Sequence, residues 1–167
     1  AFQIYGDFWG YTLIATGAAR LLGVKLADNF RSPYLASSVT DYWQRWHISL
    51  TTWFRDYLFT PLSLQLRNLR RLGIALAIVC TYLLSGFWHG ANWTFLLWGL
   101  IWGILYALEF GIGKYVRIST PRPWSIGHLL RAPIIFVIAA LALVPFRSGK
   151  VHVALQVYDT LLFAHQD

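Results

Sequence analysis

The stretch that decides the fold is LGIALAIVCTYLLSGFWHGANWTFLLWGLIWGILYAL, residues 72–108, which contains no Lys, Arg, Asp or Glu. One helix of that length would be about 55 Å long at 1.5 Å per residue, whereas a bilayer's hydrocarbon core is about 30 Å thick. Two complete spans need about 40 residues and a turn. The stretch therefore predicts a helical hairpin whose turn lies within the membrane. Gly86, Gly90 and Asn92 mark the turn, and His89 lies at its tip.

The composition of the whole chain indicates an integral membrane protein. Hydrophobic residues make up 57% of the 167 residues and charged residues only 13%, whereas soluble domains carry about a quarter charged residues. The net charge of +7 would suggest nucleic acid in a soluble protein, but no basic stripe interleaved with aromatics stands apart from the apolar runs. We therefore expect a membrane lipid bilayer as partner and no nucleic acid.

A second informative segment is SVTDYWQRWHISLTTWFRDYLFTP, residues 38–61. We expect one helix here, capped by Thr40 or Asp41 and ended by Pro61. Aromatic and apolar residues recur at helical spacing, namely Tyr42, Trp46, Leu50, Trp53 and Tyr57. Charged and titratable side chains lie among them, namely Arg45, His47, Arg55 and Asp56. Such a helix lies on the membrane interface, where these charges reach the headgroups, or it lines a polar cavity.

The remaining segments are simpler. Residues 4–22 predict a spanning or buried helix, residues 132–146 a shorter apolar helix opened by a proline, and residues 151–163 a weakly amphipathic helix. Residues 114–131 form a basic, proline-containing loop in which we expect His128 to be solvated.

The basic residues predict a topology. One cluster precedes the hairpin, namely Arg67, Arg70 and Arg71, and another follows it, namely Lys114, Arg117, Arg122 and Arg131. A hairpin returns to its starting side, so both clusters share a side, which the positive-inside rule makes cytoplasmic. Arg147 and Lys150, one further crossing away, would then face outward.

The histidines are the candidate functional residues. An ionisable residue within a membrane is a functional candidate, although His89 between Trp88 and Trp93 also fits a structural role. His47 lies in the second polar interruption of the chain. Together the two indicate acid–base chemistry or a proton relay in a transporter, and the residues alone leave both possible. The other histidines lack paired ligand spacing, so no metal site is predicted.

Two segments carry a resemblance to a known family. WQRWHISLTTWFRDYLFTPL (43–62) and GFWHGANWTFLLWGL (86–100) resemble the membrane-bound O-acyltransferase family, within it the alginate O-acetyltransferase branch. Residues 3–35 and 143–155 fit the same branch in order and spacing. Trp9, and the run at 142–146, depart from the pattern of the branch.

The resemblance implies an all-α, polytopic membrane domain with re-entrant and short helices around a central cavity. Residues 1–167 would be part of a single membrane-embedded domain and would form the C-terminal part of the family's core. We therefore expect the chain alone to be inactive.

The resemblance also assigns the site. The catalytic positions carried over are His89, the proposed general base, and His47, which would position substrate or stabilise developing charge. We expect the substrate-binding residues to be Trp46, Arg55, Asp56, Trp88 and Asn92, the last also orienting the His89 ring.

The implied reaction moves an acetyl group from a cytoplasmic thioester toward hydroxyls of an extracytoplasmic polysaccharide such as alginate. Acetyl-CoA or a similar acyl thioester would be the co-substrate, with no bound cofactor. The resemblance leaves the acceptor open between alginate, cellulose, peptidoglycan and teichoic acid. Either the polysaccharide itself or a periplasmic acetyltransferase protein would receive the acyl group, at the bacterial inner membrane. The alternatives are a transporter or transport subunit with a histidine proton relay, and a non-catalytic membrane partner.

Overall fold

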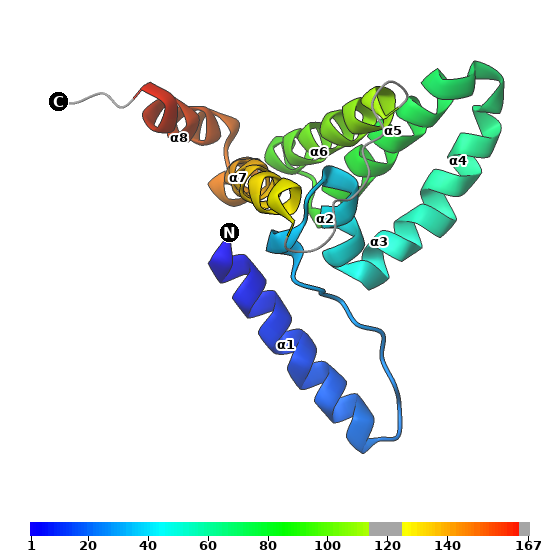
Figure 1. The fold of residues 1–167 in the computed structure, drawn as a ribbon, viewed down its shortest axis with the longest axis vertical. Coiled ribbons are helices and arrows are strands. Elements are labelled where there is room, and N and C mark those ends of the chain that lie inside the picture. Colours follow the sequence, from blue (N-terminus) through cyan, green and yellow to red (C-terminus); the bar gives the residue numbers. More distant parts are fainter. Residues whose placement is uncertain (114–124, 164–167) are drawn as a thin grey trace. The chain divides into compact units, whose positions relative to one another are not determined.

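The structure, a computed structural model, describes residues 1–113 and 125–163, and all regular elements in those ranges are helical (Figure 1). This confirms the predicted all-α class. In chain order the elements are α1 (Phe2–Leu21), η1 (Pro33–Leu35), α2 (Val39–Arg45), α3 (Ile48–Phe54), η2 (Arg55–Phe59), α4 (Thr60–Gln65), η3 (Arg67–Leu69), α5 (Arg70–His89), α6 (Trp93–Ile112), α7 (Ile126–Ser148) and α8 (Val151–Phe163).

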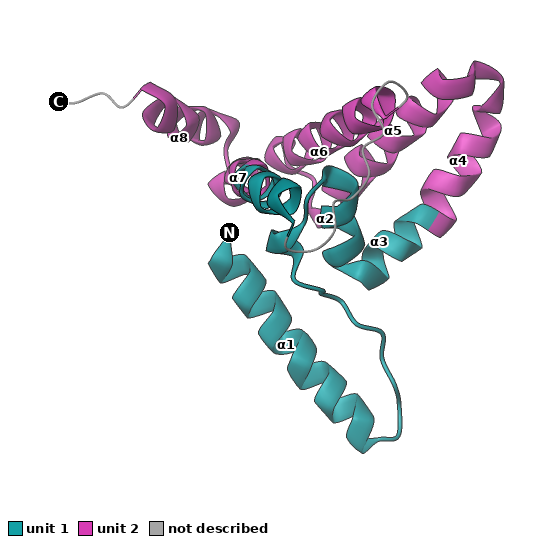
Figure 2. Ribbon diagram, in the orientation of Figure 1, with its two compact units in different colours: residues 1–55, 119–137 teal, residues 56–118, 138–167 magenta. Residues whose placement is uncertain are grey.

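The chain groups into two compact units (Figure 2). Unit 1 comprises residues 1–55 and 119–137, and unit 2 comprises residues 56–118 and 138–167. Helix α7 contributes its first half to unit 1 and its second half to unit 2.

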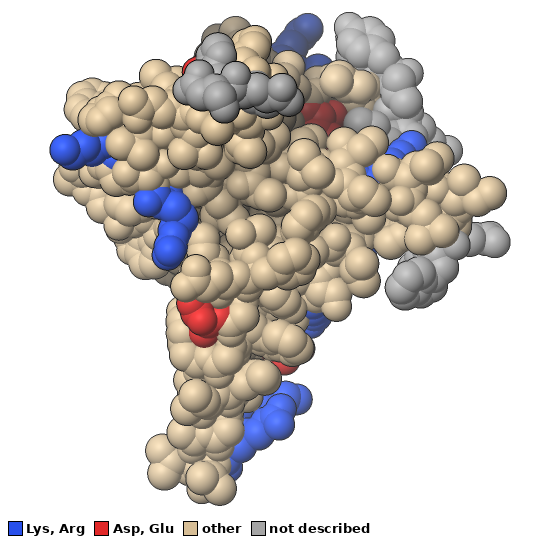
Figure 3. Space-filling view, turned by 90° about the vertical axis from the view of Figure 1, so that its left-hand side faces the viewer, with Lys and Arg blue, Asp and Glu red and all other residues tan. Residues whose placement is uncertain are grey.

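Within the described residues, three helical segments are long and apolar enough to cross a membrane: Arg67–His89, Trp93–Ile112 and Ile126–Ser148. Figure 3 shows one face of the molecule, where charged side chains occur at scattered points on an otherwise uncharged surface. A surface so poor in charge suits contact with lipid rather than water. These features support the prediction of an integral membrane protein.

In unit 2, the predicted hairpin is formed by α5 and α6, which pack along each other (Figure 1). Each has 20 residues and is therefore about 30 Å long. Arms of this length bring the turn to the opposite face of the hydrocarbon core, whereas the charge-free run predicted a turn within the membrane. The arms are longer than the charge-free run suggested, because α5 begins at Arg70 and α6 continues through Glu109 to Ile112. Charged residues at the ends of a spanning helix can reach the headgroups, so they do not mark where the helix stops.

Glycines allow the two arms to approach closely. A Cβ atom added at Gly86 would lie 2.3 Å from the carbonyl oxygen of Phe95, and one at Gly99 would lie 2.3 Å from that of Tyr82. A Cβ at Gly103 would lie 3.0 Å from the backbone of α5. Small residues are the usual means of close packing between membrane helices, where lipid provides no hydrophobic drive for association. The glycines thus set the spacing of the hairpin.

Hydrogen bonds of Asn92 hold the turn of the hairpin. Asn92 is the N-cap of α6, and its Oδ1 accepts a hydrogen bond from Thr94 N at 3.1 Å. Its Nδ2 donates to the carbonyl oxygen of Gly149 at 3.0 Å, in the turn between α7 and α8. Gly90 ends α5 with a φ of 155°, a conformation open to glycine.

The single helix predicted for residues 40–61 is wrong, because the segment divides into α2, α3, η2 and α4. The cap is Ser38, whose Oγ accepts from Asp41 N at 3.0 Å, and not Thr40 or Asp41. Pro61 does not end the segment either. It occupies the first turn of α4, where its missing N–H costs least, and the helix continues to Gln65.

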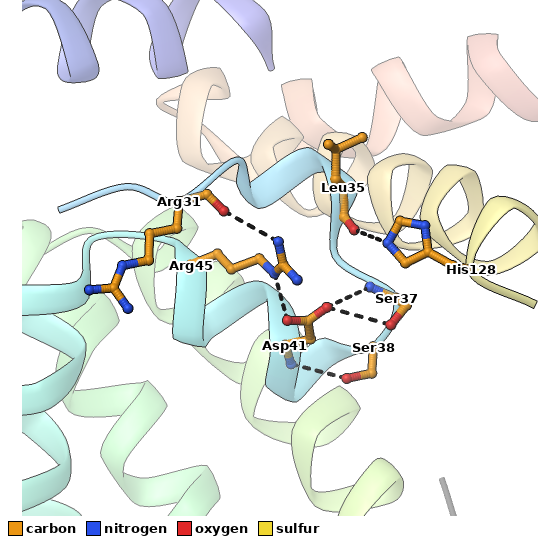
Figure 4. Close-up of polar contacts among 7 residues, drawn as sticks. All are labelled: Arg31, Leu35, Ser37, Ser38, Asp41, Arg45 and His128. Carbon is orange, nitrogen blue, oxygen red and sulfur yellow. Dashed lines mark hydrogen bonds and ion pairs between the residues drawn. The ribbon is translucent and has the colours of Figure 1, made fainter. Parts of the chain in front are cut away.

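The expected loop before the last apolar helix is also partly wrong. Helix α7 begins at Ile126, so Pro133 lies inside it, and His128 is 7% exposed rather than solvated. The His128 Nε2 lies 2.9 Å from the carbonyl oxygen of Leu35 (Figure 4). A carbonyl only accepts, so Nε2 carries the donated proton. Three basic residues assigned to the loop lie outside the described residues, namely Lys114, Arg117 and Arg122.

The hairpin predicts a labelling pattern. In the full-length protein, after Cys80→Ser, single cysteines at Asn68 and Gly113 should react with an impermeant maleimide from the cytoplasmic side. A cysteine at Ala91, in the turn, should react from the opposite side, because two arms of this length return the chain to its starting face. Labelling of positions 68 and 113 from opposite sides would contradict the hairpin topology.

The close approach of α5 and α6 predicts a steric effect. Gly99→Ala should lower the stability of the full-length protein by about 1–3 kcal/mol, because the new methyl group must push the α5 backbone away. Gly111→Ala is the matched control in the same helix, since nothing lies within 4 Å of a Cβ there. Thermal unfolding in detergent measures both, and equal melting temperatures would show that this contact does not limit stability.

Candidate functional site

His47 lies at a break in the backbone of unit 1. Helix α2 ends at Arg45, Trp46 is extended, and His47 adopts a left-handed conformation with φ 44° and ψ 52° before α3 begins at Ile48. Non-glycine residues held in this region cost on the order of 1–3 kcal/mol and cluster at functional sites. The backbone is therefore bent at the position that the sequence singled out as functional.

Two backbone hydrogen bonds to an earlier segment hold this break. Ile48 N donates to the carbonyl oxygen of Asn29 at 3.0 Å, and Arg31 N donates to that of Arg45 at 3.0 Å. Residues 29–31 thus run alongside the break and satisfy groups that a continuous helix would have paired internally. The left-handed turn at His47 is fixed from both sides.

The His47 ring is half-buried and packs edge-to-face on Phe8, with ring centroids 4.5 Å apart. Trp46 is 8% exposed and stacks on Tyr42 at 5.8 Å. Further aromatic rings surround Trp46, namely those of Tyr5, Phe8, Phe30 and Tyr34. Trp46 therefore belongs to an aromatic core that includes Phe8, the ring on which His47 packs.

The tyrosines of this cluster carry no charge at neutral pH. Burial, and secondarily the neighbouring Tyr5, raises the pKa of Tyr34 to about 12. Burial also holds the pKa of Tyr42 well above its usual value. Because a protonated phenol donates a hydrogen bond but is a poor base, neither group competes with His47 for a proton.

A partly buried ion pair stabilises α2 (Figure 4). Arg45 Nε donates to Asp41 Oδ1 at 2.6 Å, and Asp41 Oδ2 accepts from Ser37 N at 3.0 Å. Arg45 Nη1 donates to the carbonyl oxygen of Arg31 at 3.4 Å. The Arg45 guanidinium thus ties α2 to the segment beside the break. Paired and hydrogen-bonded charges are the form in which burial is tolerated.

Arg55 and Asp56 open η2, which is a π-helical turn, and both side chains are exposed. The π-helical turn inserts one extra residue per turn and changes the direction in which later side chains point. Such turns are frequent at functional sites. The helical spacing assumed from the sequence does not hold through this turn.

His89 is the last residue of α5 in unit 2 and is half-buried. Its ring meets Trp98 edge-to-face at 5.2 Å and Phe146 at 5.0 Å, and Trp88 lies at 4.9 Å. Phe95 lies at 6.2 Å. Edge-to-face contacts orient a ring without using its nitrogens. The aromatic residues therefore orient the imidazole through ring contacts that do not involve its nitrogen atoms.

The tryptophans near the hairpin divide between core and surface. Trp98 and Trp102 are 5% and 1% exposed and form the interior of the hairpin, whereas Trp88 and Trp93 are 58% and 76% exposed beside the turn. Amphipathic rings at the end of a spanning segment are typical of the membrane–water interface.

The hydrogen bonds of Asn92 differ from expectation. Its amide caps α6 and ties the turn to Gly149, so the structure does not support the idea that it orients the His89 ring. Two contributors were not predicted, namely Phe146 against His89 and Asn29 beside His47. Both are far from the histidines in sequence, and no local pattern could have linked them.

The described residues, 1–113 and 125–163, contain no group of three or more His, Cys, Asp or Glu side chains that could hold a metal ion. His47 with Trp46 belongs to unit 1, and Trp88, His89 and Asn92 belong to unit 2.

Comparisons with known proteins identify relatives along most of the chain. The protein described as "Probable alginate O-acetylase AlgI" of Pseudomonas syringae pv. tomato is 38% identical over 95% of this chain and 29% of its own length. The peptidoglycan O-acetyltransferase of Helicobacter pylori is 36% identical over 94% of the chain and 29% of its own length. The teichoic acid D-alanyltransferase of Streptococcus thermophilus is 35% identical over 62% of the chain and 26% of its own length.

The chain thus spans less than a third of the length of these relatives. The sequence model of the membrane-bound O-acyltransferase family matches residues 1–147, a range that includes both histidine segments. The chain therefore belongs to the membrane-bound O-acyltransferase family.

Proposed function

We propose that this chain is part of the membrane-embedded catalytic domain of an O-acyltransferase, with His89 as the general base. The observation that carries the proposal is the position of the His89 imidazole, oriented by Trp98 and Phe146 at the end of α5. Family membership supports the type of reaction. Residues 1–167 then form one part of a single larger domain.

The reaction needs a base because a hydroxyl is a weak nucleophile. Neutral His89 accepts the proton of the acceptor hydroxyl. At the same time, the hydroxyl oxygen attacks the thioester carbonyl carbon, which forms a C–O bond and a tetrahedral intermediate. Collapse of the intermediate breaks the C–S bond, and the thiolate takes the proton from the imidazolium. Base catalysis of this kind contributes about 10²–10⁴-fold.

His47 is the second functional residue, and it positions a substrate or stabilises the charge that develops on the carbonyl oxygen. The strained backbone at His47 supports this role, since such strain persists where surrounding contacts require it. Arg55, Asp56 and Trp88 have exposed side chains suited to contact with substrate. Trp46 acts indirectly, by packing against Phe8, which contacts the His47 ring.

The relatives favour an acetyl group and a polysaccharide acceptor. The two O-acetyltransferase relatives cover 95% and 94% of the chain, whereas the D-alanyltransferase covers 62%. We therefore favour acetyl transfer from a cytoplasmic thioester, without a resident cofactor, toward an extracytoplasmic polysaccharide such as alginate or a periplasmic acetyltransferase protein. The bacterial inner membrane is the compartment where such a donor and acceptor meet.

The environment of His89 favours this chemistry over a proton relay. The rings around it, within the described residues, are those of Trp88, Phe95, Trp98 and Phe146. Aromatic hydrocarbon faces do not pass protons along a chain, whereas apolar surroundings of this kind suit the contact of an imidazole with an acyl group.

Substitution of His89 separates chemistry from structure. In the full-length protein, His89→Ala and His89→Gln should both lower acetyl transfer by at least about 10²-fold, because neither side chain takes a proton at neutral pH. Membrane yield should stay near that of the unsubstituted protein. Acetyl content of the polysaccharide and protein level measure the two effects. A His89→Gln protein that acetylates well would exclude His89 as the general base.

Substitution of His47 separates strain from chemistry. His47→Asn should keep the stability of the full-length protein, because asparagine tolerates the left-handed region, whereas His47→Val should lose about 1–3 kcal/mol. Both should lose most transferase activity, since neither carries an imidazole. Thermal unfolding in detergent together with an acyl-transfer assay gives the comparison. Equal stability of the two variants would show that the left-handed backbone is not maintained in the full-length protein.

A further inference from the structure

Helix α3 has an unusual cap. The N-cap side chain of a helix commonly accepts a hydrogen bond from a backbone N–H of the first turn. His47 occupies this position, and its side chain makes no such bond to α3. The first turn is capped instead from another part of unit 1.

Asn29 supplies the missing cap with two different oxygens. Its backbone carbonyl oxygen accepts from Ile48 N at 3.0 Å. Its side-chain Oδ1 accepts from Ser49 N at 3.3 Å and from Ser49 Oγ at 2.6 Å. Asn29 lies 20 positions before Ser49 in the chain, so it performs from a distance the task that an N-cap residue performs locally.

We propose that Asn29 is a positioning residue for His47: by capping α3 in its place, it keeps the His47 imidazole out of the cap and directed at Phe8. The inference rests on the proposed function of His47 in acyl transfer. Without the Asn29 side-chain oxygen, the amide of Ser49 loses that partner. His47 occupies the N-cap position, from which a side chain commonly accepts such a hydrogen bond, so its imidazole would take over the cap. The ring then leaves Phe8 for the cap, and the strained backbone loses one of the contacts that hold it.

The test uses the full-length protein with four single substitutions and one double substitution. Asn29→Ala removes the side-chain oxygen and leaves the backbone oxygen, whereas Asn29→Asp keeps an oxygen acceptor. Asp28→Ala is the matched control on the same segment, since within the described part of the chain its carboxylate makes an exposed ion pair with Arg31 at 3.7 Å. The fourth substitution, His47→Ala, is made alone and also together with Asn29→Ala. The measurements are kcat and KM for the acyl donor, and amide hydrogen exchange of residues 48–51.

We expect Asn29→Ala to lower kcat by about tenfold to a hundredfold with little change in KM, as misplacement of a catalytic group does. Asn29→Asp should restore most of kcat, and Asp28→Ala should leave it unchanged. Exchange of residues 48–51 should be faster in Asn29→Ala. In the His47→Ala background, Asn29→Ala should cause no further loss of kcat, because a residue that acts only through His47 has nothing left to position.

Three outcomes would overturn the proposal. Faster exchange with an unchanged kcat would show that Asn29 caps α3 without affecting His47. A further loss of kcat in the His47→Ala background would show that Asn29 acts through some other group. Full activity of His47→Ala alone would remove His47 from the reaction, whereas the proposed O-acyl transfer by His89 is tested separately by the His89 variants.

Discussion

A bilayer offers no water to the backbone, so each N–H and C=O group within it needs a partner in the protein. This demand accounts for the all-helical fold and for the way its helices are interrupted. A helix satisfies its own backbone everywhere except at its ends. The places where α2 and α5 stop are therefore where this protein must use side chains, and they are also where His47 and His89 lie.

Both interruptions are resolved by an asparagine. Asn92 caps α6 from its own N-cap position and reaches across to Gly149. Asn29 reaches across from an earlier segment to cap α3 beside His47. In each case the amide joins a helix start to a distant part of the same unit. The backbone next to each histidine is thereby fixed without use of the histidine's own side chain as a cap.

Aromatic packing complements these polar caps. His47 rests on Phe8 above the rings around Trp46, and His89 rests on Trp98 and Phe146. Edge-to-face contacts restrict ring rotation. The same arrangement at both histidines suggests a common physical solution, in which hydrocarbon rings set the orientation of an imidazole and hydrogen bonds set the backbone that carries it. Glycines in α5 and α6 complete the arrangement by bringing Phe95 and Trp98 within reach of His89.

The class of protein, the helical hairpin and the two histidine segments that match the family could all be predicted from the amino-acid sequence. Those features follow from runs free of charge and from local motifs, which a linear sequence displays directly. The three-dimensional structure was needed to show that the segment around His47 is broken and that η2 is a π-helical turn. It also decided that His128 is buried against Leu35. Hydrophobic periodicity reports which face of a helix is apolar, but the left-handed turn at His47 depends on hydrogen bonds that Ile48 and Ser49 donate to Asn29. Asn29 lies outside that helix and belongs to no local pattern.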